Sequence, residues 1–209
     1  MPRITALRPT RRPGRCAVHV DGTYAFTVDE GFLARHALPE GRDLSDAEYD
    51  AIRSDAEGER ALADAYRLLG HRARSRAELA AKLRQRGHDE PTVTLVMARV
   101  DERGLLDDDA FARAFAADKK NLGGWGRDRV VRELRRLGVD DHIVADVLPA
   151  DDEGEVGRAL VLLRKRGPAR PPLDAARRRA RDQLLRRGFS SPVAGAAVRR
   201  WLDETPTSQ

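Results

Sequence analysis

The later part of this 209-residue chain repeats itself about every 50 residues. Three segments each combine a helix-like pattern, a glycine and a second helix-like pattern, with the glycines at Gly87, Gly138 and Gly188. A leucine stands four positions before each glycine, and a small apolar residue stands six positions after it. Glycine at such a place ends a helix, because it adopts the left-handed conformation without a Cβ clash. A period of this length indicates a repeat array rather than a single core.

A further helix-like segment precedes each of these pairs, so each repeat is predicted to contain three helices. Phe111, Ala112 and Phe115, for example, have the three- and four-residue spacing of a helix face. Because one such unit buries little surface, we expect neighbouring repeats to share a core. The third repeat has weaker apolar positions and a looser inner loop, "GPARPPLDA", as is typical of a terminal repeat. The predicted repeats are residues 59–105 (repeat 1), 106–150 (repeat 2) and 151–205 (repeat 3).

The N-terminal segment, residues 1–58, has a different pattern. Apolar residues alternate on both sides of Asp21-Gly22, which predicts a β-hairpin, and "ITAL" offers another strand. "FLARHAL" is typical of a short helix, and a capping box at Ser45–Glu48 begins a longer one. The predicted fold is therefore mainly α: an elongated array of three tandem three-helix repeats, preceded by a small N-terminal β-hairpin module with short helices.

Several classes of protein are disfavoured by the composition. Cys16 is the only cysteine, so no disulfide framework is expected. The five histidines lack the spacing of metal ligands, and we expect no metal site and no cofactor. No signal peptide and no apolar run of about 20 residues is found, which favours a cytoplasmic protein that does not contact a membrane.

Three consecutive aspartates, Asp107–Asp109, stand before the first helix of repeat 2. They suggest either a metal-dependent active site or the start of a helix, where acidic side chains accept free N–H groups and complement the helix dipole. Acidic residues recur at other predicted helix starts, at Asp89, Asp140 and Asp151. This recurrence favours capping, and we expect no catalytic residues; an enzyme that uses the aspartates is the alternative.

The segment "GGWGRDRV" invites comparison with a phosphate-binding loop, but it lacks the GxxxxGK[ST] pattern. We interpret it as a loop and a helix start. A second interpretation is that Trp125 stacks on a base or a partner while the glycines allow close approach.

Positive charge is concentrated in the repeats. Residues 1–58 hold eight arginines against ten acidic residues, whereas the whole chain has a net charge of +5 and a pI of about 9.8. In the middle helix of repeat 2, Val130, Leu134 and Leu137 form the expected buried stripe, which leaves Arg129, Arg132 and Arg136 on the opposite face. For one helix a solvated face is the simpler interpretation, but recurrence in three repeats favours a basic surface that meets a polyanion or an acidic protein.

The expected contacts are to a backbone rather than to bases. The basic residues of this predicted surface are Arg72, Arg74, Arg76, Lys82, Arg84, Arg86, Lys119, Lys120, Arg127, Arg129, Arg132, Arg135, Arg136, Arg178, Arg179, Arg186 and Arg187.

Three segments resemble a known family. "HRARSRAELAAKLRQRG", "RGLLDDDAFARAF" and "GRDRVVRELRRLGV" resemble the signatures of the bacterial RecX family, the regulators of the RecA recombinase. The segment "VDGTYAFTVDEGFLARHAL" resembles the β extension of its longer members. Lys119 and Lys120 depart from the family pattern, since members more often carry arginine before this glycine segment.

The resemblance implies a curved array of three-helix repeats that binds the RecA–single-stranded DNA filament within its groove. It implies a non-enzymatic regulator that restrains filament growth, ATP hydrolysis and strand exchange in recombination and the SOS response. The expected partners are the RecA filament and DNA, single-stranded first and duplex second, and the expected state is a monomer. The alternative function is a helical DNA-binding protein, such as a transcription regulator, that acts without RecA.

Overall fold

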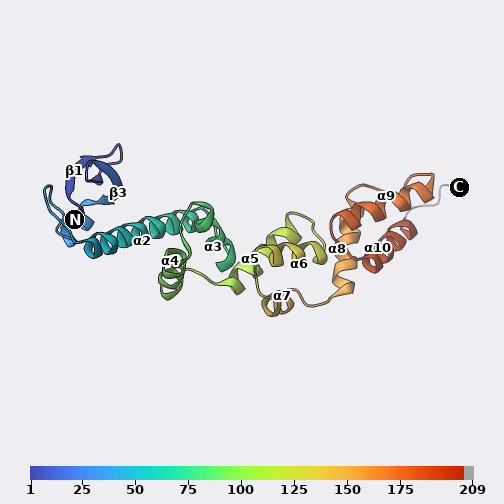
Figure 1. Ribbon diagram of the computed structural model, residues 1–209. Helices are drawn as coiled ribbons and strands as arrows, with labels where there is room; N and C mark the ends of the chain where they lie inside the picture. The colour runs from blue at the N-terminus through green and yellow to red at the C-terminus, as the bar shows by residue number, and fades with distance from the viewer. Residues whose placement is uncertain (205–209) are drawn as a thin grey trace. The chain divides into compact units, whose positions relative to one another are not determined.

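The computed structural model describes residues 1–204 (Figure 1). The chain forms two compact units. The first consists of Met1–Arg74 and Glu78–Leu106, and the second consists of Ser75–Ala77 together with the chain from Asp107 onward. The short segment Ser75–Ala77 therefore packs with the second unit. The helix that starts in this segment continues from Glu78 onward into the first unit.

A three-stranded antiparallel sheet begins the first unit: β1 (Ile4–Pro9), β2 (Arg15–Val20) and β3 (Thr23–Asp29), in the order β1-β2-β3. Asp21 and Gly22 connect β2 to β3 with φ angles of 50° and 79°, which confirms the predicted hairpin turn. The short helix α1 (Glu30–Arg35) begins two residues before the predicted segment. The cause is Asp29, whose carboxylate accepts the Phe32 N–H at 2.7 Å and caps the helix.

Three helices complete this unit: α2 (Asp46–His71), α3 (Arg76–Gln85) and α4 (Glu90–Glu102). The capping box at Ser45–Glu48 is present and starts α2. The N-terminal half of α2 packs on the sheet through Ile52 and Ala56, and its C-terminal half packs on α3 and α4 (Figure 1). The expected boundary between residues 58 and 59 thus falls inside one continuous helix that serves two cores.

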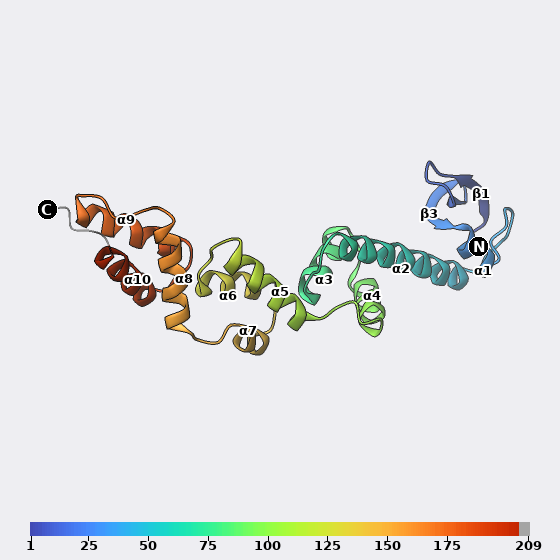
Figure 2. The same cartoon turned by 180° about the vertical axis from the view of Figure 1, so that it is seen from behind.

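The second unit contains two sets of three helices, which Figure 2 shows from behind. The helices are α5 (Asp108–Asn121), α6 (Arg127–Arg136), α7 (Asp141–Val147), α8 (Asp152–Arg164), α9 (Leu173–Arg186) and α10 (Ser191–Asp203). The predicted fold class, mainly helical repeats after a small sheet, is confirmed. No helix within residues 1–204 is long and apolar enough to cross a membrane.

Glycine ends the middle helix of every repeat, as the sequence predicts. Gly87, Gly138 and Gly188 have φ angles of 86°, 74° and 85°. In each case the residue after the glycine donates its N–H to the carbonyl of the leucine four positions before the glycine. This residue is also buried in all three repeats, and in repeats 2 and 3 it is apolar, Val139 and Phe189, which adds the apolar contact that stabilises such a helix end.

Each repeat has its own cluster of buried side chains, so the expectation of one shared core is wrong for the described residues. The prediction of a weak third repeat is also wrong, because its cluster contains 14 buried residues against nine and eight in the first two. Trp201 supplies much of this core. Its indole N–H donates to the Gly167 carbonyl at 3.1 Å and so ties α10 to the loop that follows α8.

Candidate functional site

All three aspartates of the Asp107–Asp109 run have structural partners. Asp107 accepts the Ala110 N–H at 2.9 Å and caps α5, and Asp108 accepts the Arg76 N–H at 2.9 Å. Asp109 binds Arg113 one turn later, and this hydrogen bond lowers the pKa of its carboxyl group. Within residues 1–204, no group of three or more histidine, cysteine or acidic side chains is placed to hold a metal. The run therefore starts a helix and joins it to α3.

The capping prediction holds at two of the three other positions. Asp89 accepts the Thr92 N–H at 3.0 Å, and Asp151 accepts the Gly154 N–H at 2.9 Å. Asp140 occupies the N-cap position of α7, but its side chain makes no capping hydrogen bond. Asp141, in the first turn of α7, adds a second acidic side chain at that helix start.

The glycine segment before α6 forms a contact between two helix ends, which we call a joint, rather than a ligand-binding loop. The Gly126 N–H donates to the Arg187 carbonyl at 2.9 Å, and the Asp128 N–H donates to the Gly188 carbonyl at 3.1 Å. A Cβ at Gly126 would lie 2.3 Å from the Gly188 oxygen, so only glycine permits this approach. The N-terminus of α6 is therefore fixed to the C-terminal end of α9.

Trp125 is half-buried beside this joint, and its ring is occupied within the molecule. The Arg129 guanidinium lies 3.9 Å from the ring centroid, and the Lys119 amine lies 5.7 Å from it. This arrangement corrects two expectations: Trp125 does not present a free face on that side, and Arg129 is half-buried rather than solvated. Cation–π attraction accounts for the contact.

A second joint of the same kind lies at the start of α3. The Ser75 hydroxyl donates to the Leu137 carbonyl, and a Cβ at Gly138 would lie 2.2 Å from the Cβ of Ala77. The start of each joined helix also donates one N–H to a carboxylate of the following repeat, as in Arg127 to Glu155 at 2.9 Å. Sequence reasoning missed both joints. Their signal is a small residue, Ser75 or Gly126, twelve positions before the repeat glycine.

Two of the predicted contact residues occupy equivalent positions and make the same internal bond. Arg84 and Arg135 each stand three residues before the repeat glycine, and each binds an acid three residues after it. The distances are 2.6 Å for both Arg84 to Glu90 and Arg135 to Asp141. Their recurrence therefore reflects a bridge across the turn that joins two helices of one repeat.

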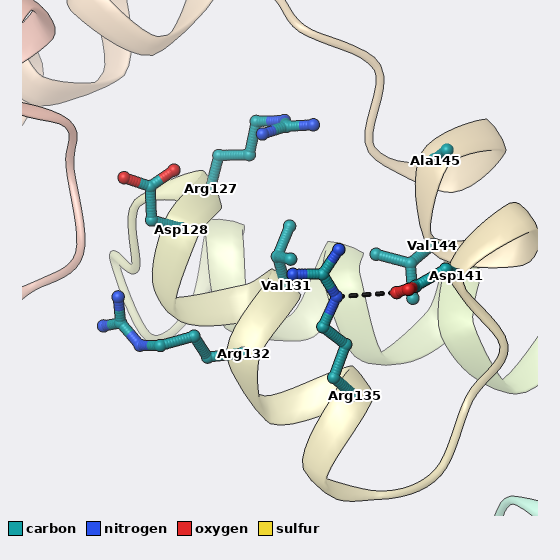
Figure 3. Close-up of a pocket in the computed structure, with 8 residues that line it drawn as sticks. All are labelled: Arg127, Asp128, Val131, Arg132, Arg135, Asp141, Val144 and Ala145. Atoms are coloured by element: carbon teal, nitrogen blue, oxygen red, sulfur yellow. Dashed lines mark hydrogen bonds and ion pairs between the residues drawn. The ribbon is translucent and has the colours of Figure 1, made fainter.

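Figure 3 shows the second of these bridges, at a cavity of about 350 Å³ between α6 and α7. Arg135 reaches across the cavity to Asp141, while Arg132 extends in the other direction. Arg127 lines the same cavity and donates its Nε–H to the Leu148 carbonyl at 2.9 Å. Two of these three arginines therefore stabilise the repeat itself.

Most of the other predicted contact residues also have partners inside the protein. They are Arg72 and Arg74 with Glu78, Arg86 with Asp64, Lys82 with Gln85, Lys119 with Asp118, Arg136 with Glu133, and Arg187 with the Gly123 and Gly124 carbonyls. Arg74 is the most enclosed, with its side chain only 10% exposed. The Arg76 side chain is exposed on the first turn of α3.

Four predicted residues remain exposed without an ion-pair or hydrogen-bond partner among residues 1–204. We call Arg132, Arg178, Arg179 and Arg186 the free quartet. One is on α6 and three are on α9. Their guanidinium groups offer five N–H donors each without first breaking an internal bond.

Lys120 belongs to a different group of cations. It is half-buried, and burial together with the charges of Arg158 and Arg127 lowers the pKa of its amine. Burial likewise lowers the pKa of Arg158. Asp151 acts on both groups in the opposite sense. Arg158 also binds the buried Glu155 carboxylate, so this group of cations already has an anion within the protein.

Comparison with known proteins identifies the family. Residues 61–99 match the family model of the first three-helix domain of RecX, and residues 107–148 match that of the second. The regulatory protein RecX of Bacillus subtilis (strain 168) is 30% identical over 203 residues, which cover 95% of this chain and 76% of that protein. The chain belongs to the RecX family.

Other RecX proteins agree with this assignment. That of Geobacillus kaustophilus is 32% identical over 186 residues, covering 87% of this chain and 69% of that protein. That of Mycobacterium sp. (strain KMS) is 42% identical over 144 residues, covering 65% and 78%. A crystal structure of regulatory protein RecX superimposes with a TM-score of 0.63 at 24% identity, covering 92% of this chain and 97% of the other, which shows the same fold.

The RecX family matches fall on repeats 1 and 2, in which most of the predicted contact arginines are paired. Three members of the free quartet, Arg178, Arg179 and Arg186, lie in α9, outside both matched segments. The homologues place this chain among the RecX regulatory proteins, while its most available cations lie in its own third repeat.

Proposed function

We propose that this protein binds the filament of a RecA recombinase on single-stranded DNA and restrains its growth, ATP hydrolysis and strand exchange during recombination and the SOS response. The observation that carries the proposal is the 30% identity over 203 residues to the regulatory protein RecX of Bacillus subtilis. That similarity supports a regulatory role. The proposed binding partner is the one that the resemblance to the RecX family implies.

The free quartet is the best candidate for the contact. A guanidinium group binds phosphate or carboxylate through paired, charge-assisted hydrogen bonds. Arg132, Arg178, Arg179 and Arg186 are exposed and have no partner to give up among residues 1–204. Both surfaces of a nucleoprotein filament, acidic protein and DNA backbone, suit such groups. Contacts of this kind give affinity and position without reading a base sequence.

Regulation requires only binding in this account, with no chemical step. A protein that prefers one state of the filament stabilises that state by its difference in affinity. The recombinase must rearrange during ATP hydrolysis and strand exchange, and a bound array that spans several protomers opposes the rearrangement. This is a coupling between sites, of the usual size of about 1–3 kcal/mol for allosteric effects.

The DNA-dependent ATPase of a RecA recombinase tests the proposal. We expect the rate to fall as this protein is added up to the molar amount of the recombinase. An unchanged rate at that amount would contradict the proposal.

A sedimentation assay separates the alternative function. The protein is mixed with preassembled filament, free recombinase, single-stranded DNA or duplex DNA, and the bound fraction is measured. Preference for filament supports the proposal. Equally tight binding to bare duplex would favour a helical DNA-binding protein that acts without the recombinase.

A further inference from the structure

The first unit contains a basic cavity whose arginines are not among the predicted contact residues. It has a volume of about 450 Å³ and lies between the loop that joins β1 to β2 and one side of α2. Five arginines line it: Arg11, Arg12 and Arg15 from the loop and the start of β2, and Arg60 and Arg67 from α2. The two groups of arginines are separated by 45 residues or more in the sequence, and the fold brings them together.

The three loop arginines are available to a ligand. Arg11, Arg12 and Arg15 have no side-chain hydrogen bond or ion pair among residues 1–204. The loop itself is fixed by main-chain bonds, from Thr10 to Arg15 at 2.9 Å and from Arg15 to Arg12 at 3.2 Å. Because the backbone is already ordered, binding there costs less conformational entropy than it would for a free loop.

The two helix arginines are partly neutralised. Arg60 binds Glu57 at 2.7 Å, and Arg67 binds Asp64 at 3.0 Å. Asp64 is the only acidic residue among those that line the cavity within the described chain. The three loop arginines therefore carry a positive excess that nothing in the cavity balances, and the field of the cavity favours an anion.

A second cavity of about 590 Å³ adjoins the first and adds an aromatic ring. The two cavities share Thr27 and Arg60, and the second is lined by Tyr24 and Arg53 as well. It also has three acidic residues, Asp50, Glu57 and Asp89, so we assign the phosphate contacts to the first cavity alone. Tyr24 is 61% exposed at the start of β3, which is an edge strand of the sheet.

The Tyr24 ring is held in place from two sides. Its hydroxyl lies 3.2 Å from that of Thr27, and the His19 ring meets it edge-on at 6.2 Å. An exposed but fixed ring beside arginines has the chemistry of a stacking platform.

We propose that these two adjoining cavities bind single-stranded DNA, with Arg11, Arg12 and Arg15 on the phosphates and Tyr24 stacked on a base. Backbone phosphates match guanidinium groups, and an unpaired base offers a flat face to a fixed ring. Duplex DNA supplies the phosphates but keeps its bases stacked inside, and an acidic peptide supplies charge without a base. The site is independent of the free quartet and of any recombinase.

The test is binding of the full-length protein alone to a labelled 25-residue thymidine oligonucleotide, measured by fluorescence anisotropy over a range of salt concentrations. The variant Arg11→Gln/Arg12→Gln/Arg15→Gln is expected to bind at least tenfold more weakly. Its slope of log affinity against log salt should be smaller by about 2, because three phosphate contacts are lost.

A control with the same loss of charge is available in Arg99→Gln/Arg170→Gln/Arg199→Gln, which removes three exposed arginines elsewhere that have no partner within residues 1–204. This control should bind nearly as the natural protein does. Tyr24→Ala should weaken binding about five- to tenfold, whereas Tyr24→Phe, which keeps the ring, should have little effect.

Photocrosslinking gives a local readout. An oligonucleotide that carries 5-iodouracil should crosslink to the peptide that contains Tyr24, and polyphosphate or polyglutamate in excess should compete less well than unlabelled oligonucleotide.

Equal affinities of the two arginine variants, a crosslink confined to the repeats, or stronger competition by polyglutamate would each overturn the proposal. None of these outcomes bears on the recombinase ATPase assay, so this site and the regulatory function can fail separately.

Discussion

Repeats 1 and 3 use the same helix pattern in opposite ways. In repeat 1 the glycine that ends the middle helix faces open space, because a Cβ at Gly87 would meet no described atom within 4 Å. The basic side chains around it are bound internally, as Arg84 is to Glu90. In repeat 3 a Cβ at Gly188 would collide with Arg129, while Arg178, Arg179 and Arg186 have no ion-pair or hydrogen-bond partner in the described part of the chain.

This difference shows that recurrence of a residue in a repeat protein does not by itself indicate a binding surface. Arg84 and Arg135 recur because each bridges one turn of its own repeat. At the matching position repeat 3 has Leu185, and the arginines of its middle helix lie elsewhere on the helix. Recurrence therefore does not decide whether a cation is available: Arg186 is exposed without an ion-pair partner among residues 1–204, whereas Arg136, at the matching position of repeat 2, binds Glu133.

The largest effect is expected at the glycines. Gly188→Ala adds a Cβ at a φ of +85° and places it 2.2 Å from the Arg129 Cβ, whereas Gly87→Ala at +86° meets open space. Left-handed strain alone costs about 1–2 kcal/mol, so we expect that loss for Gly87→Ala. For Gly188→Ala we expect a loss of about 2–5 kcal/mol because overpacking adds to the strain. Urea denaturation followed by circular dichroism measures both; equal losses would mean that the joint at Gly188 does not form.

A pH-dependent effect is expected at the buried histidine of repeat 1. His88 is buried where repeats 2 and 3 have Val139 and Phe189, and its ring nitrogens lie 2.6 Å from Glu57 and 3.1 Å from Asp64. Burial raises the pKa of Asp64, but the hydrogen bond from His88 and the charges of Arg86 and Arg67 outweigh it, and the pKa is lowered.

Because the folded pKa of Asp64 lies below its unfolded value of about 3.9, its contribution to stability is present above that pH and is lost as the pH falls through the folded value. Asp64→Asn should therefore destabilise the protein by about 1 kcal/mol at neutral pH. The same variant should show a weaker loss of stability below about pH 4 than the natural protein. Urea midpoints measured from pH 7 to pH 3 provide the comparison, and parallel curves for the two proteins would contradict this account of the His88 pair.

The smallest predicted effect is the difference in stability between replacing a paired arginine and replacing an unpaired one. Arg84→Gln breaks an exposed ion pair and should lower stability slightly. Arg186→Gln breaks none and should change stability by less than about 0.5 kcal/mol. Differential scanning calorimetry of both variants tests whether Arg84 is paired and Arg186 is not. A larger loss of stability for Arg186→Gln than for Arg84→Gln would contradict this assignment.

Local features of the fold follow from the sequence because their causes are local. The hairpin at Asp21-Gly22, the capping box at Ser45–Glu48 and the glycine helix ends each depend on a few neighbouring residues. The joints were missed because they depend on which helix end meets which, as Gly126 meets Gly188 across 62 residues.

Pairing of charges was the harder part of the site to predict. The list of basic residues could not separate Arg132 from Arg135, since the difference lies in the direction of each side chain relative to Asp141 (Figure 3). The cavity at Arg11, Arg12 and Arg15 was hidden because the segment that contains it has more acidic residues than arginines. The net charge of a segment does not reveal a cluster of like charges that the fold brings together.

The most direct test of the central claim compares two variants that lose the same charge. One replaces the free quartet, Arg132, Arg178, Arg179 and Arg186, with glutamine. The other replaces four paired arginines, Arg72, Arg84, Arg135 and Arg136, in the same way. Affinity for the preassembled RecA–single-stranded DNA filament is measured for both. The account predicts a loss of tenfold or more for the first variant and little change for the second; equal losses would show that net charge, and not the free quartet, determines binding.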